Sequence, residues 1–517
     1  MKQADVIVLG GTPGGIAAAL AAGRRGRNVL LIEHHAHLGG MAASGLGKSD
    51  VEQRHLIGGL FAEFTIRVRE HYRDRFREDS HDFKLCQNGY YHEPAVAEKV
   101  FNAMLAECPN VSVLTQHRLT QAEVSDHALK RIEIADRTNN TNTWYAAKVF
   151  IDATYEGDLF AAAGAEFRLG RESREEFDEP HAGQIYFDYQ NARILPGSTG
   201  AADDRLPAWT YRLCLTTDPA DAYKLTEAPD GYDRGVYCGY FADLAAGRLA
   251  GPKVVKPGRG YNPDHFDTMV RALSVTELPN AKTDVNINPR PLGFPFPEEN
   301  TGYLEADAAG RDRICQRHRD LTLGLLWFLQ NDSEIPAAHR QIARQYHLPR
   351  SEFIDNGHFP FQLYIREARR LVGEYTLTEH DLTSDLIHHH NDTIAVGEFP
   401  IDSFPCRKRQ PTDTIVLEGY LGMLDSITRP YEIPYRIMIP RSIDGLIVPV
   451  AASTTHVAYS SIRMEPTWMA LGQAAGTAAH LSLRDDLPMR SISTESLREQ
   501  LLADGQVLGI NSKSDRT

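Results

Sequence analysis

The sequence has few cysteines and no long apolar run. Six cysteines occur among 517 residues, and no two of them stand at the spacing of a metal site or a redox dithiol. A disulfide framework, a zinc site and a dithiol centre are therefore not expected. The longest apolar stretches, such as Ile16 to Ala22, are too short to span a bilayer, so we expect no membrane span. Any electrons that the protein handles need another carrier.

Basic charge and an N-terminal leader are also lacking. The formal charge is -14, whereas nucleic-acid binding requires a concentrated basic surface, so we expect no nucleic-acid partner. No charged segment followed by an apolar one precedes the first predicted strand, which starts near Ala4. This pattern predicts a cytoplasmic protein. With 42% hydrophobic and 24% charged residues, the composition is that of an ordinary globular protein.

The N-terminal segment has the pattern of a strand, a glycine-rich turn, a helix and a second strand. An apolar strand over Asp5 to Leu9 runs into Gly10 to Gly15, and an alanine-rich helix follows over Ile16 to Arg25. The second strand, Val29 to Ile32, ends at Glu33. Strands that are apolar throughout are typical of a parallel sheet covered on both faces. The segment therefore predicts a βαβ unit.

The turn of this unit is similar to the glycine fingerprint that binds the pyrophosphate of a dinucleotide. Such a turn needs bare backbone for close approach and a helix N-terminus that faces the anion. Gly10 and Gly15 occupy the first and third glycine positions, and Gly11 and Gly14 keep the rest of the loop accessible. Thr12 replaces the middle glycine, so the match is imperfect and a purely structural turn is the alternative.

The surroundings of the turn favour a cofactor site, and they favour FAD over NAD. Glu33 follows Gly10 by 33 - 10 = 23 positions, where a carboxylate can accept two ribose hydroxyls. A second glycine pair follows at Gly39 and Gly40, and the segments 152–158 and 471–479 complete a three-part set that NAD folds lack. The expected cofactor-binding residues are Gly10, Gly11, Thr12, Pro13, Gly14, Gly15, Glu33, His34, Gly39, Gly40, Met41, Asp152, Ala153, Thr154, Gly157, Asp158, Gly472, Gln473, Ala474 and Ala475.

The small-residue helix over 471–479 has two interpretations. A helix N-terminus near Gly472 would stabilise negative charge on reduced flavin. Alternatively, the small residues serve close packing against another helix. The sequence leaves both open.

The remaining pattern predicts an α/β fold with an inserted domain. Alternating stretches near 119–124, 131–134 and 144–147 predict a β-meander that crosses over the sheet, and strand character returns at 445–450. We expect a Rossmann-like FAD-binding domain, with a parallel sheet and a β-meander crossover, plus an inserted α+β substrate domain. The predicted boundaries are 1–164 for the N-terminal part of the FAD-binding domain, 165–413 for the substrate domain, 414–485 for the C-terminal part of the FAD-binding domain, and 486–517 for a C-terminal helix and tail.

The sequence resembles a bacterial family of FAD-dependent oxidoreductases, some of whose members are labelled xanthan lyase. The resemblance covers nearly the whole chain and rests on residues 10–17, 38–41, 151–159, 170–173, 364–371 and 462–466. Thr12 looks typical of this family, whereas Ala452 stands where related strands often carry glycine. The resemblance implies a glutathione-reductase-like FAD domain with an inserted substrate domain, and it implies no particular substrate.

The loop before the small-residue helix supplies the candidate catalytic residues. Oxidation of a carbinol by hydride transfer to flavin N5 requires a base for the hydroxyl proton. His456 is the first candidate, with Tyr459 as a weaker one, and a histidine that only hydrogen-bonds its own loop is the structural alternative. Arg463 is expected to orient a carboxylate or a polyhydroxylated substrate.

Further polar residues are expected to contact the substrate. Arg366 and Arg370 are candidates for bidentate binding, although Arg369 and Arg370 could instead form ion pairs with Glu367 and Glu374. Asn286 belongs to an alternating polar strand with Lys282, Asp284 and Asn288, which either lines the site or forms an exposed edge. We expect no metal site, because the run His388-His389-His390 is typical of a solvated loop.

These patterns predict an FAD-dependent dehydrogenase or oxidase that acts on a C–OH bond of a small polar substrate, either sugar-derived or a hydroxy acid. Flavin-dependent amine oxidation or monooxygenation is a second possibility, and a non-catalytic flavin-binding subunit of a complex is a third. No second glycine-rich strand-turn-helix occurs, so oxygen, a quinone or a protein carrier is the expected electron acceptor. The sequence does not predict the oligomeric state.

Overall fold

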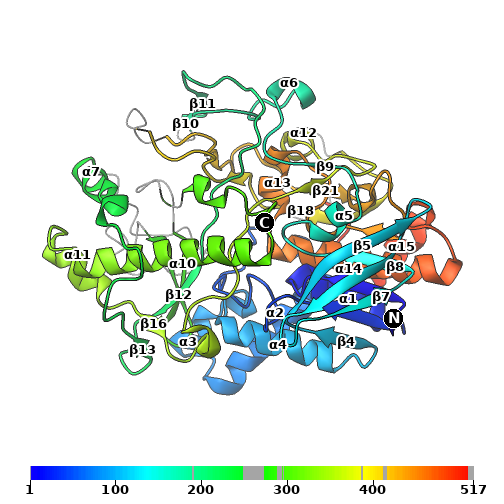
Figure 1. Cartoon of the computed structure of the whole chain (residues 1–517), viewed down its shortest axis with the longest axis horizontal. Helices are drawn as coiled ribbons and strands as arrows, with labels where there is room; N and C mark the ends of the chain where they lie inside the picture. Colours follow the sequence, from blue (N-terminus) through cyan, green and yellow to red (C-terminus); the bar gives the residue numbers. More distant parts are fainter. Residues whose placement is uncertain are drawn as a thin grey trace.

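A five-stranded parallel sheet carries the N-terminal glycine turn (Figure 1). The computed structural model describes residues 2–188, 191–247, 273–287, 294, 296–385, 388–410 and 416–510. The strand order is β22-β8-β2-β3-β4, and each neighbouring pair is parallel, as predicted. The strands are β2 (Val6–Leu9), β3 (Val29–Ile32), β4 (Val111–Leu114), β8 (Val149–Asp152) and β22 (Leu446–Ile447).

The two faces of this sheet pack against different layers. Val6 and Val8 of β2 belong to the core that contains helix α1 (Pro13–Gly23), whereas Ile7 and Leu9 pack with the meander. This alternation follows from the two-residue period of a strand. The meander is the predicted crossover, and its strands β5 (His117–Ser125), β6 (Ala128–Asp136) and β7 (Thr141–Ala146) pair antiparallel, with β1 (Lys2–Gln3) added beside β7.

Helix α14 (Glu465–Asp485), in the C-terminal part of the chain, packs against α1 so closely that the two backbones are in contact. A Cβ on Gly472 would stand 2.0 Å from the carbonyl oxygen of Gly14, and one on Gly476 would stand 2.1 Å from that of Ala18. The predicted helix start near Gly472 is therefore wrong, because the helix begins at Glu465 and Gly472 lies inside it. The alternative of close packing by small residues describes this helix correctly.

A second, antiparallel sheet lies outside the βαβ unit. Its order is β12-β15-β14, with β12 (Leu213–Thr216), β14 (Val275–Leu278) and β15 (Lys282–Val285). Strand β15 is central and all of its residues are buried, so the interpretation of this segment as an exposed edge is wrong. Asn286 follows the strand, and Asn288 lies outside the described residues. The long helix α10 (Ala308–Asn331) runs along the same side of the molecule (Figure 1).

The remaining helices and strands complete the fold around these layers. The further helices are α2 (Gly59–Arg75), α3 (His81–Leu85), α4 (Pro94–Ala106), α5 (Asp158–Ala162), α6 (Arg174–Phe177), α7 (Gly239–Ala245), α11 (Ala337–Ala343), α12 (Glu379–Thr383), α13 (His456–Ile462) and α15 (Thr494–Ala503). The further strands are β9 (Phe167–Arg168), β10 (Phe187–Asp188), β11 (Arg193–Ile194), β13 (Ala222–Tyr223), β16 (Leu348–Pro349), β17 (Arg370–Leu371), β18 (Thr393–Gly397), β19 (Asp402–Ser403), β20 (Gly422–Met423) and β21 (Tyr431–Pro434).

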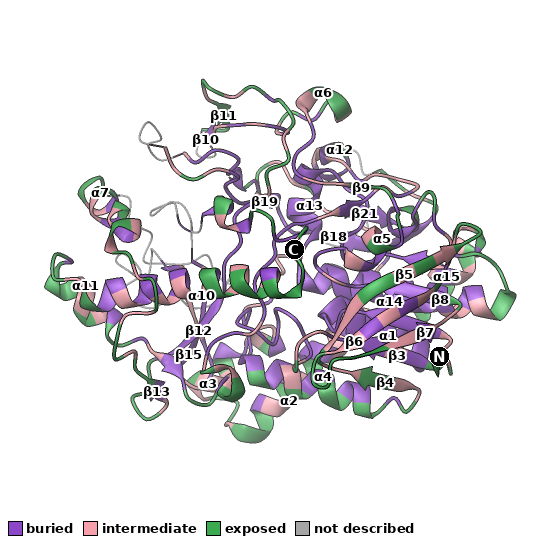
Figure 2. Cartoon of the chain, in the orientation of Figure 1, coloured by how far each residue is buried: buried purple, intermediate pink, exposed green. Residues whose placement is uncertain are grey.

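The burial of the chain agrees with the predicted α/β class. Figure 2 shows α14 and the central strands β2 and β8 of the parallel sheet buried, while the edge strand β4, α7 and the outer side of α10 are exposed. Within the described ranges, no helix is both long and apolar enough to cross a membrane. The division into domains stays a prediction, and its boundary at residue 413 falls outside the described residues.

Gly472→Ala tests the contact between α1 and α14. In an unconstrained helix this change stabilises by up to ~1 kcal/mol, whereas overpacking a tight contact costs ~1–3 kcal/mol. We expect a net loss of stability, because the new methyl group overlaps the carbonyl oxygen of Gly14. The free energy of unfolding, measured with urea, gives the sign. A gain in stability would show that the two helices are not in backbone contact.

Candidate active site

The glycine turn is shaped so that only glycine fits its first and third positions. Gly10 has a φ of +103°, and a Cβ there would stand 2.6 Å from the carbonyl group of Ala153. A Cβ on Gly15 would stand 1.9 Å from the carbonyl oxygen of Gly10. The structure also explains why threonine stands at the middle position: Thr12 Oγ1 accepts from the Gly15 amide at 3.1 Å and donates to the Ala153 carbonyl at 2.9 Å. It caps α1 and fastens the turn to the loop after β8.

Glu33 places a buried carboxylate beside this turn. Its Oε2 accepts from the Gly11 amide at 2.6 Å, and its Oε1 accepts from the His35 amide at 2.8 Å and lies 2.8 Å from His34 Nδ1. Burial raises the pKa of Glu33, but the charge and hydrogen bond of His34 and the contacts with His35 outweigh it and hold the pKa at about 2. Glu33 is therefore an ionised acceptor at neutral pH.

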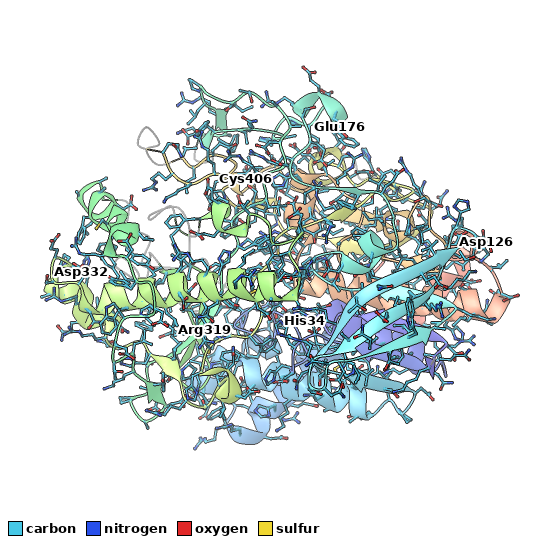
Figure 3. All side chains as sticks on the ribbon, in the orientation of Figure 1. His34, Asp126, Glu176, Arg319, Asp332 and Cys406 are labelled. Atoms are coloured by element: carbon cyan, nitrogen blue, oxygen red, sulfur yellow. The ribbon has the colours of Figure 1, made fainter. Side chains whose placement is uncertain are left out.

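Two cavities open at the carboxyl edge of the parallel sheet. The smaller measures about 40 Å³ and reaches Gly10 and Thr154, and the larger measures about 220 Å³. They share His34, Arg118, Tyr303 and Arg311. Figure 3 labels His34 near α10, whose Arg319 also lines the larger cavity.

A hydrogen-bonded chain links the second glycine pair to α14. Gly39 and Gly40 have φ values of +98° and +47°, and the next amide, Met41 N, donates to Tyr155 Oη at 3.0 Å. Tyr155 in turn donates to Glu465 Oε1 at 2.5 Å. The glycine pair, the loop after β8 and the start of α14 therefore meet at one place.

Three buried polar atoms in α14 and in the loop before α13 have no hydrogen-bond partner among the described residues. They are Thr454 Oγ1, Glu465 Oε2 and Trp468 Nε1. Burial raises the pKa of Glu465 to about 8, which favours its protonated, hydrogen-bond-donating form. Since buried polar atoms are nearly always paired, these atoms fit a bound group that carries its own donors and acceptors.

Several predicted cofactor residues use their side chains within the fold. Asp152 accepts from Thr154 and from the Phe160 amide, and burial raises its pKa to about 6. Asp158 forms ion pairs with Arg311 and Arg369. Gln473 accepts from the Leu60 amide at 2.7 Å, on the side of α14 that meets α2, and Ala474 and Ala475 are buried in the same helix. Gly157, with a φ of +69°, forms the turn before α5.

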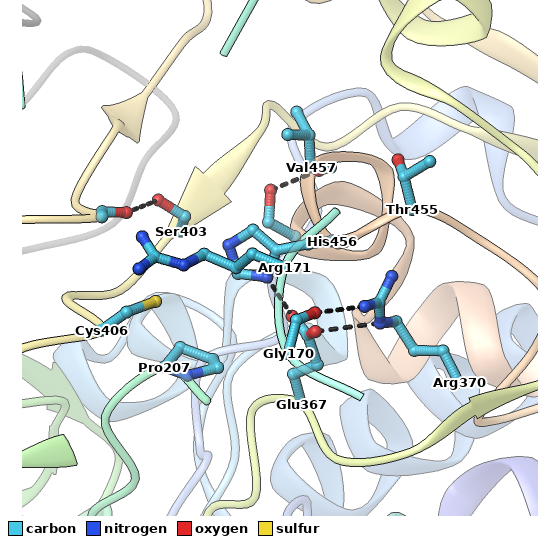
Figure 4. A network of polar contacts seen from close by, with 12 residues as sticks. Gly170, Arg171, Pro207, Glu367, Arg370, Ser403, Cys406, Thr455, His456 and Val457 are labelled. Atoms are coloured by element: carbon cyan, nitrogen blue, oxygen red, sulfur yellow. Dashed lines mark hydrogen bonds and ion pairs between the residues drawn. The ribbon is translucent and has the colours of Figure 1, made fainter. Parts of the chain in front are cut away.

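His456 stands at the N-terminus of α13 with a buried carboxylate behind its ring. Its Nδ1 lies 2.7 Å from Glu367 Oε2, and both side chains are almost completely buried. Glu367 also forms an ion pair with Arg370 Nε at 2.9 Å, so one carboxylate lies between an imidazole and a guanidinium (Figure 4). Sequence reasoning missed this role of Glu367, although the residue lies within the motif at 364–371 and was considered as an ion-pair partner.

The pKa of His456 reflects these neighbours. Burial lowers it, while the charge of Glu367 and hydrogen bonds to Cys406 and Glu367 raise it, and the balance is about 10. Tyr459, the weaker candidate, lies one turn further along α13, and its hydroxyl is 3.5 Å from the Val450 carbonyl. Of the two candidate bases, only His456 is hydrogen-bonded to a carboxylate, that of Glu367, whereas the Tyr459 hydroxyl donates to a backbone carbonyl.

Arg370 is committed to contacts within the protein. Its Nη1 donates to Glu172 Oε1 and to the Thr454 carbonyl, each at 2.9 Å, and its Nη2 donates to the Gly170 carbonyl. The ion-pair interpretation thus describes Arg370 with Glu367, whereas Glu374 pairs with Arg490 instead.

Arg366 differs from Arg370 in having unused donors. It is 1% exposed, and its Nη1 donates to the Ala208 carbonyl at 2.9 Å, but Nε and Nη2 have no hydrogen-bond partner among the described residues. Its guanidinium contacts the rings of Tyr364 and Phe404, 4.3 and 3.7 Å from their centroids. Burial, together with the charges of Arg463 and Arg212, lowers the pKa of Arg366 to about 9.

Arg463 and Asn286, the other predicted site residues, differ in their hydrogen bonds. Arg463 donates to Tyr364 Oη at 3.0 Å and to the Asp402 carbonyl at 2.7 Å, which places it beside Arg366. Asn286 Oδ1 is buried without a hydrogen-bond partner among the described residues. His388 and His389 point to separate carboxylates, those of Asp381 and Glu432, and do not converge on one point.

The sequence matches the family model "FAD dependent oxidoreductase" over residues 5–501. The chain belongs to this family. Its cofactor is accordingly FAD, and the unpaired buried atoms, the Glu33 carboxylate and the glycine turn fit such a dinucleotide. The predicted enzyme class, a flavin-dependent oxidoreductase, is confirmed.

Similarity to solved structures is partial. THI4 of Thermovibrio ammonificans is 18% identical, with 33% of this chain and 67% of that one covered and a TM-score of 0.25. The FAD complex of glycerol-3-phosphate dehydrogenase from Bacillus halodurans is 16% identical, with 36% and 43% covered and a TM-score of 0.23. A geranylgeranyl bacteriochlorophyll reductase-like protein of Thermoplasma acidophilum is 21% identical, with 32% and 43% covered and a TM-score of 0.22. The chain thus spans less than half the length of the last two. No curated protein matches the sequence.

Glu33→Gln tests the predicted ribose contact of this family member. The amide keeps the shape but loses the negative charge, and a hydrogen bond to a charged group contributes ~1.5–3 kcal/mol, so FAD affinity should fall about 10–100-fold. Titration of the apoprotein with FAD, followed by flavin fluorescence, measures the change. Glu63→Gln, in a surface ion pair with Arg24, is the matched control. Equal affinity in the two variants would remove Glu33 from the cofactor site.

Proposed function

We propose that the enzyme oxidises a C–OH bond of a small polar substrate that carries a carboxylate, such as a hydroxy acid or a sugar acid. Bound FAD supplies the hydride acceptor, flavin N5. The observation that carries the proposal is the buried guanidinium of Arg366, two of whose donor nitrogens have no hydrogen-bond partner in the part of the chain that the structure describes. The residues named below supply binding and proton transfer.

Arg366 supports a carboxylate substrate by its chemistry and its position. A buried charge without an ionic partner costs several kcal/mol, and an anion beside it offsets that cost. Nε and Nη2 lie on one edge of the guanidinium, the arrangement that receives a carboxylate through two parallel hydrogen bonds. The rings of Tyr364 and Phe404 pack against the group and hold it in place. Arg463, anchored on Tyr364 and Asp402, adds a second positive charge nearby.

His456 and Glu367 support proton removal from the substrate hydroxyl. Glu367 holds Nδ1, so Nε2 is the ring nitrogen that can receive a proton. The carboxylate fixes the ring orientation and stabilises the imidazolium that forms. Arg370 holds Glu367 from its other side, which keeps the carboxylate ionised and in place. Asn286, with its unused Oδ1, is proposed as a further contact for a substrate hydroxyl.

The proposal extends to the setting of the reaction. We infer that the enzyme is cytoplasmic. We also infer that its electron acceptor is oxygen, a quinone or a protein carrier, because a second dinucleotide turn is not evident in the sequence. Amine oxidation, NAD(P)H-dependent hydroxylation and a non-catalytic flavin-binding role are the competing functions, and each gives a different result with the purified protein. Under anaerobic conditions, loss of the visible flavin absorption with hydroxy acids supports the proposal. Loss with amines, or with NADPH alone, supports a competitor.

Arg366→Gln tests the carboxylate contact. Loss of charged hydrogen bonds worth ~1.5–3 kcal/mol should raise the half-saturating hydroxy-acid concentration for flavin reduction about 10–100-fold. A neutral polyol should be affected much less, because it makes no ion pair. Stopped-flow flavin reduction measures both.

Arg234→Gln serves as the control for this substitution, since Arg234 pairs with Asp332 outside the site. FAD content, read from the visible spectrum, shows that the Arg366 variant is folded. An unchanged hydroxy-acid concentration dependence in folded Arg366→Gln would refute the contact.

Glu367→Gln tests the pH dependence of the base. Only neutral imidazole can accept the proton, so the rate of flavin reduction should rise with pH towards the His456 pKa of about 10. Removing the Glu367 charge lowers that pKa, so the rise should move to lower pH by about one unit or more. The profile of flavin reduction against pH gives the midpoint. Glu374→Gln, which alters a pair with Arg490, should leave the midpoint in place. A midpoint that is the same in both variants would exclude His456 as the base.

A further inference from the structure

Cys406 lines a cavity that is lined by none of the predicted cofactor residues. The cavity measures about 380 Å³, and we call it the Cys406 cavity. Cys406 is 1% exposed and follows β19 by three residues, and its Sγ is 3.7 Å from the Phe404 carbonyl. Figure 3 shows Cys406 far from His34, the residue at the sheet edge. Neither His34 nor any other predicted cofactor residue lines the Cys406 cavity.

The thiol lies among groups that activate sulfur. Cys406 is among the neighbours that raise the pKa of His456, whose Nδ1 is held by Glu367 at 2.7 Å, while the thiol itself donates to the Phe404 carbonyl at 3.7 Å. Figure 4 shows the imidazole with Glu367 on one side and Cys406 on the other. The order thiol, imidazole, carboxylate is the arrangement in which a base removes the thiol proton and a third group orients the base.

A guanidinium adds positive charge on another side of the sulfur. A Cβ on Gly419 would stand 3.0 Å from Cys406 Sγ and 3.1 Å from Arg171 Nη1, so both groups lie against the same glycine. Arg171 is fixed there by Asp203 and Glu418, each at 2.6 Å. The two carboxylates reduce its net charge, so His456 is the main partner of the thiol.

The Cys406 cavity also presents an unused polar atom. Asn300 is 4% exposed and lines the cavity, its Nδ2 donates to the Pro207 carbonyl at 2.9 Å, and its Oδ1 has no hydrogen-bond partner among the described residues. Such an atom fits a ligand with an N–H or O–H donor. It is an observation independent of the thiol, from a second residue that lines the same cavity.

We propose that Cys406 is a nucleophilic thiol, activated by His456 and Glu367, that reacts with a small cationic disulfide entering through the Cys406 cavity. His456 Nε2 takes the thiol proton, and the thiolate attacks one sulfur of the disulfide. A bond forms between Cys406 Sγ and that sulfur, the original S–S bond breaks, and the second sulfur leaves as a thiolate that can take the proton from His456. The exchange needs no oxidant beyond the disulfide itself.

The preference for a cationic disulfide comes from the mouth of the cavity. Three exposed carboxylates, those of Asp204, Glu298 and Glu305, line it against one exposed cation, Arg205. Arg205 lies 3.8 Å from Glu298, which offsets its charge. The mouth therefore attracts an ammonium group and repels a carboxylate.

The modification itself does not depend on the oxidation proposed above. One consequence of the modification rests on the proposed function. Because His456 is also the proposed base, a mixed disulfide at Cys406 would stop hydroxyl oxidation. Detection of the modified peptide by mass spectrometry separates the two, because it requires neither substrate nor flavin turnover.

Cystamine and dithiodipropionate, a cationic and an anionic disulfide, test the proposal on the FAD-loaded enzyme. The rate of mixed-disulfide formation at each cysteine is followed by peptide mass spectrometry. We expect Cys406 to react with cystamine about tenfold faster than with dithiodipropionate, and faster than the more exposed Cys238 does. Comparable rates at Cys406 and Cys238 would overturn the proposal.

Glu367→Gln and His456→Gln separate activation from mere access. Each should lower the Cys406 rate about tenfold or more while the Cys238 rate, which also reports on folding, stays the same. If one variant fails to retain FAD, the other is used. If both fail, the rates of Cys406 with cystamine and with dithiodipropionate in the unmodified protein still test the proposal. A Cys406 rate that is equal in unmodified protein and a folded variant would show that His456 and Glu367 do not activate the thiol.

Discussion

Backbone contact between α1 and α14 is the constraint on which the rest of the site depends. Gly472 and Gly476 let α14 approach the carbonyl groups of Gly14 and Ala18 more closely than any side chain would allow. That approach fixes the start of α14, where Glu465 meets Tyr155 and, through it, the amide of Met41. Helix α13 precedes α14 directly, so His456 and Arg463 are placed by the same contact.

Buried charge is the second organising feature of the site. Glu367 is shared by His456 and Arg370, and Arg370 is shared by Glu367 and Glu172. Removing one member of a buried pair leaves an uncompensated charge, at a cost of ~3–5 kcal/mol. The network therefore holds its members in one arrangement. Arg366 is outside this network, and two of its nitrogens have no partner within the described ranges, which supports a binding role, whereas the contacts of Arg370 support a structural one.

Much of the FAD-binding unit could be predicted because its signals are local. The apolar strands, the turn at Gly10 to Gly15 and the meander follow from periodicity and from the conformational needs of glycine. The start of α14 could not be predicted, because the packing of Gly472 on Gly14 joins residues far apart in the chain. The same holds for Glu367 with His456, and for the central position of β15, whose alternating polar residues suggested an edge. Charge neutralisation by distant partners leaves no periodic trace in the sequence.

The most direct test of the account is the effect of deuterium at the carbinol carbon of a hydroxy acid on anaerobic reduction of the bound flavin. Hydride transfer from that carbon, with His456 receiving the hydroxyl proton, predicts flavin reduction that is severalfold slower with the deuterated acid. Absence of flavin reduction by any hydroxy acid or sugar acid, or reduction at the same rate with both isotopes, would contradict the account.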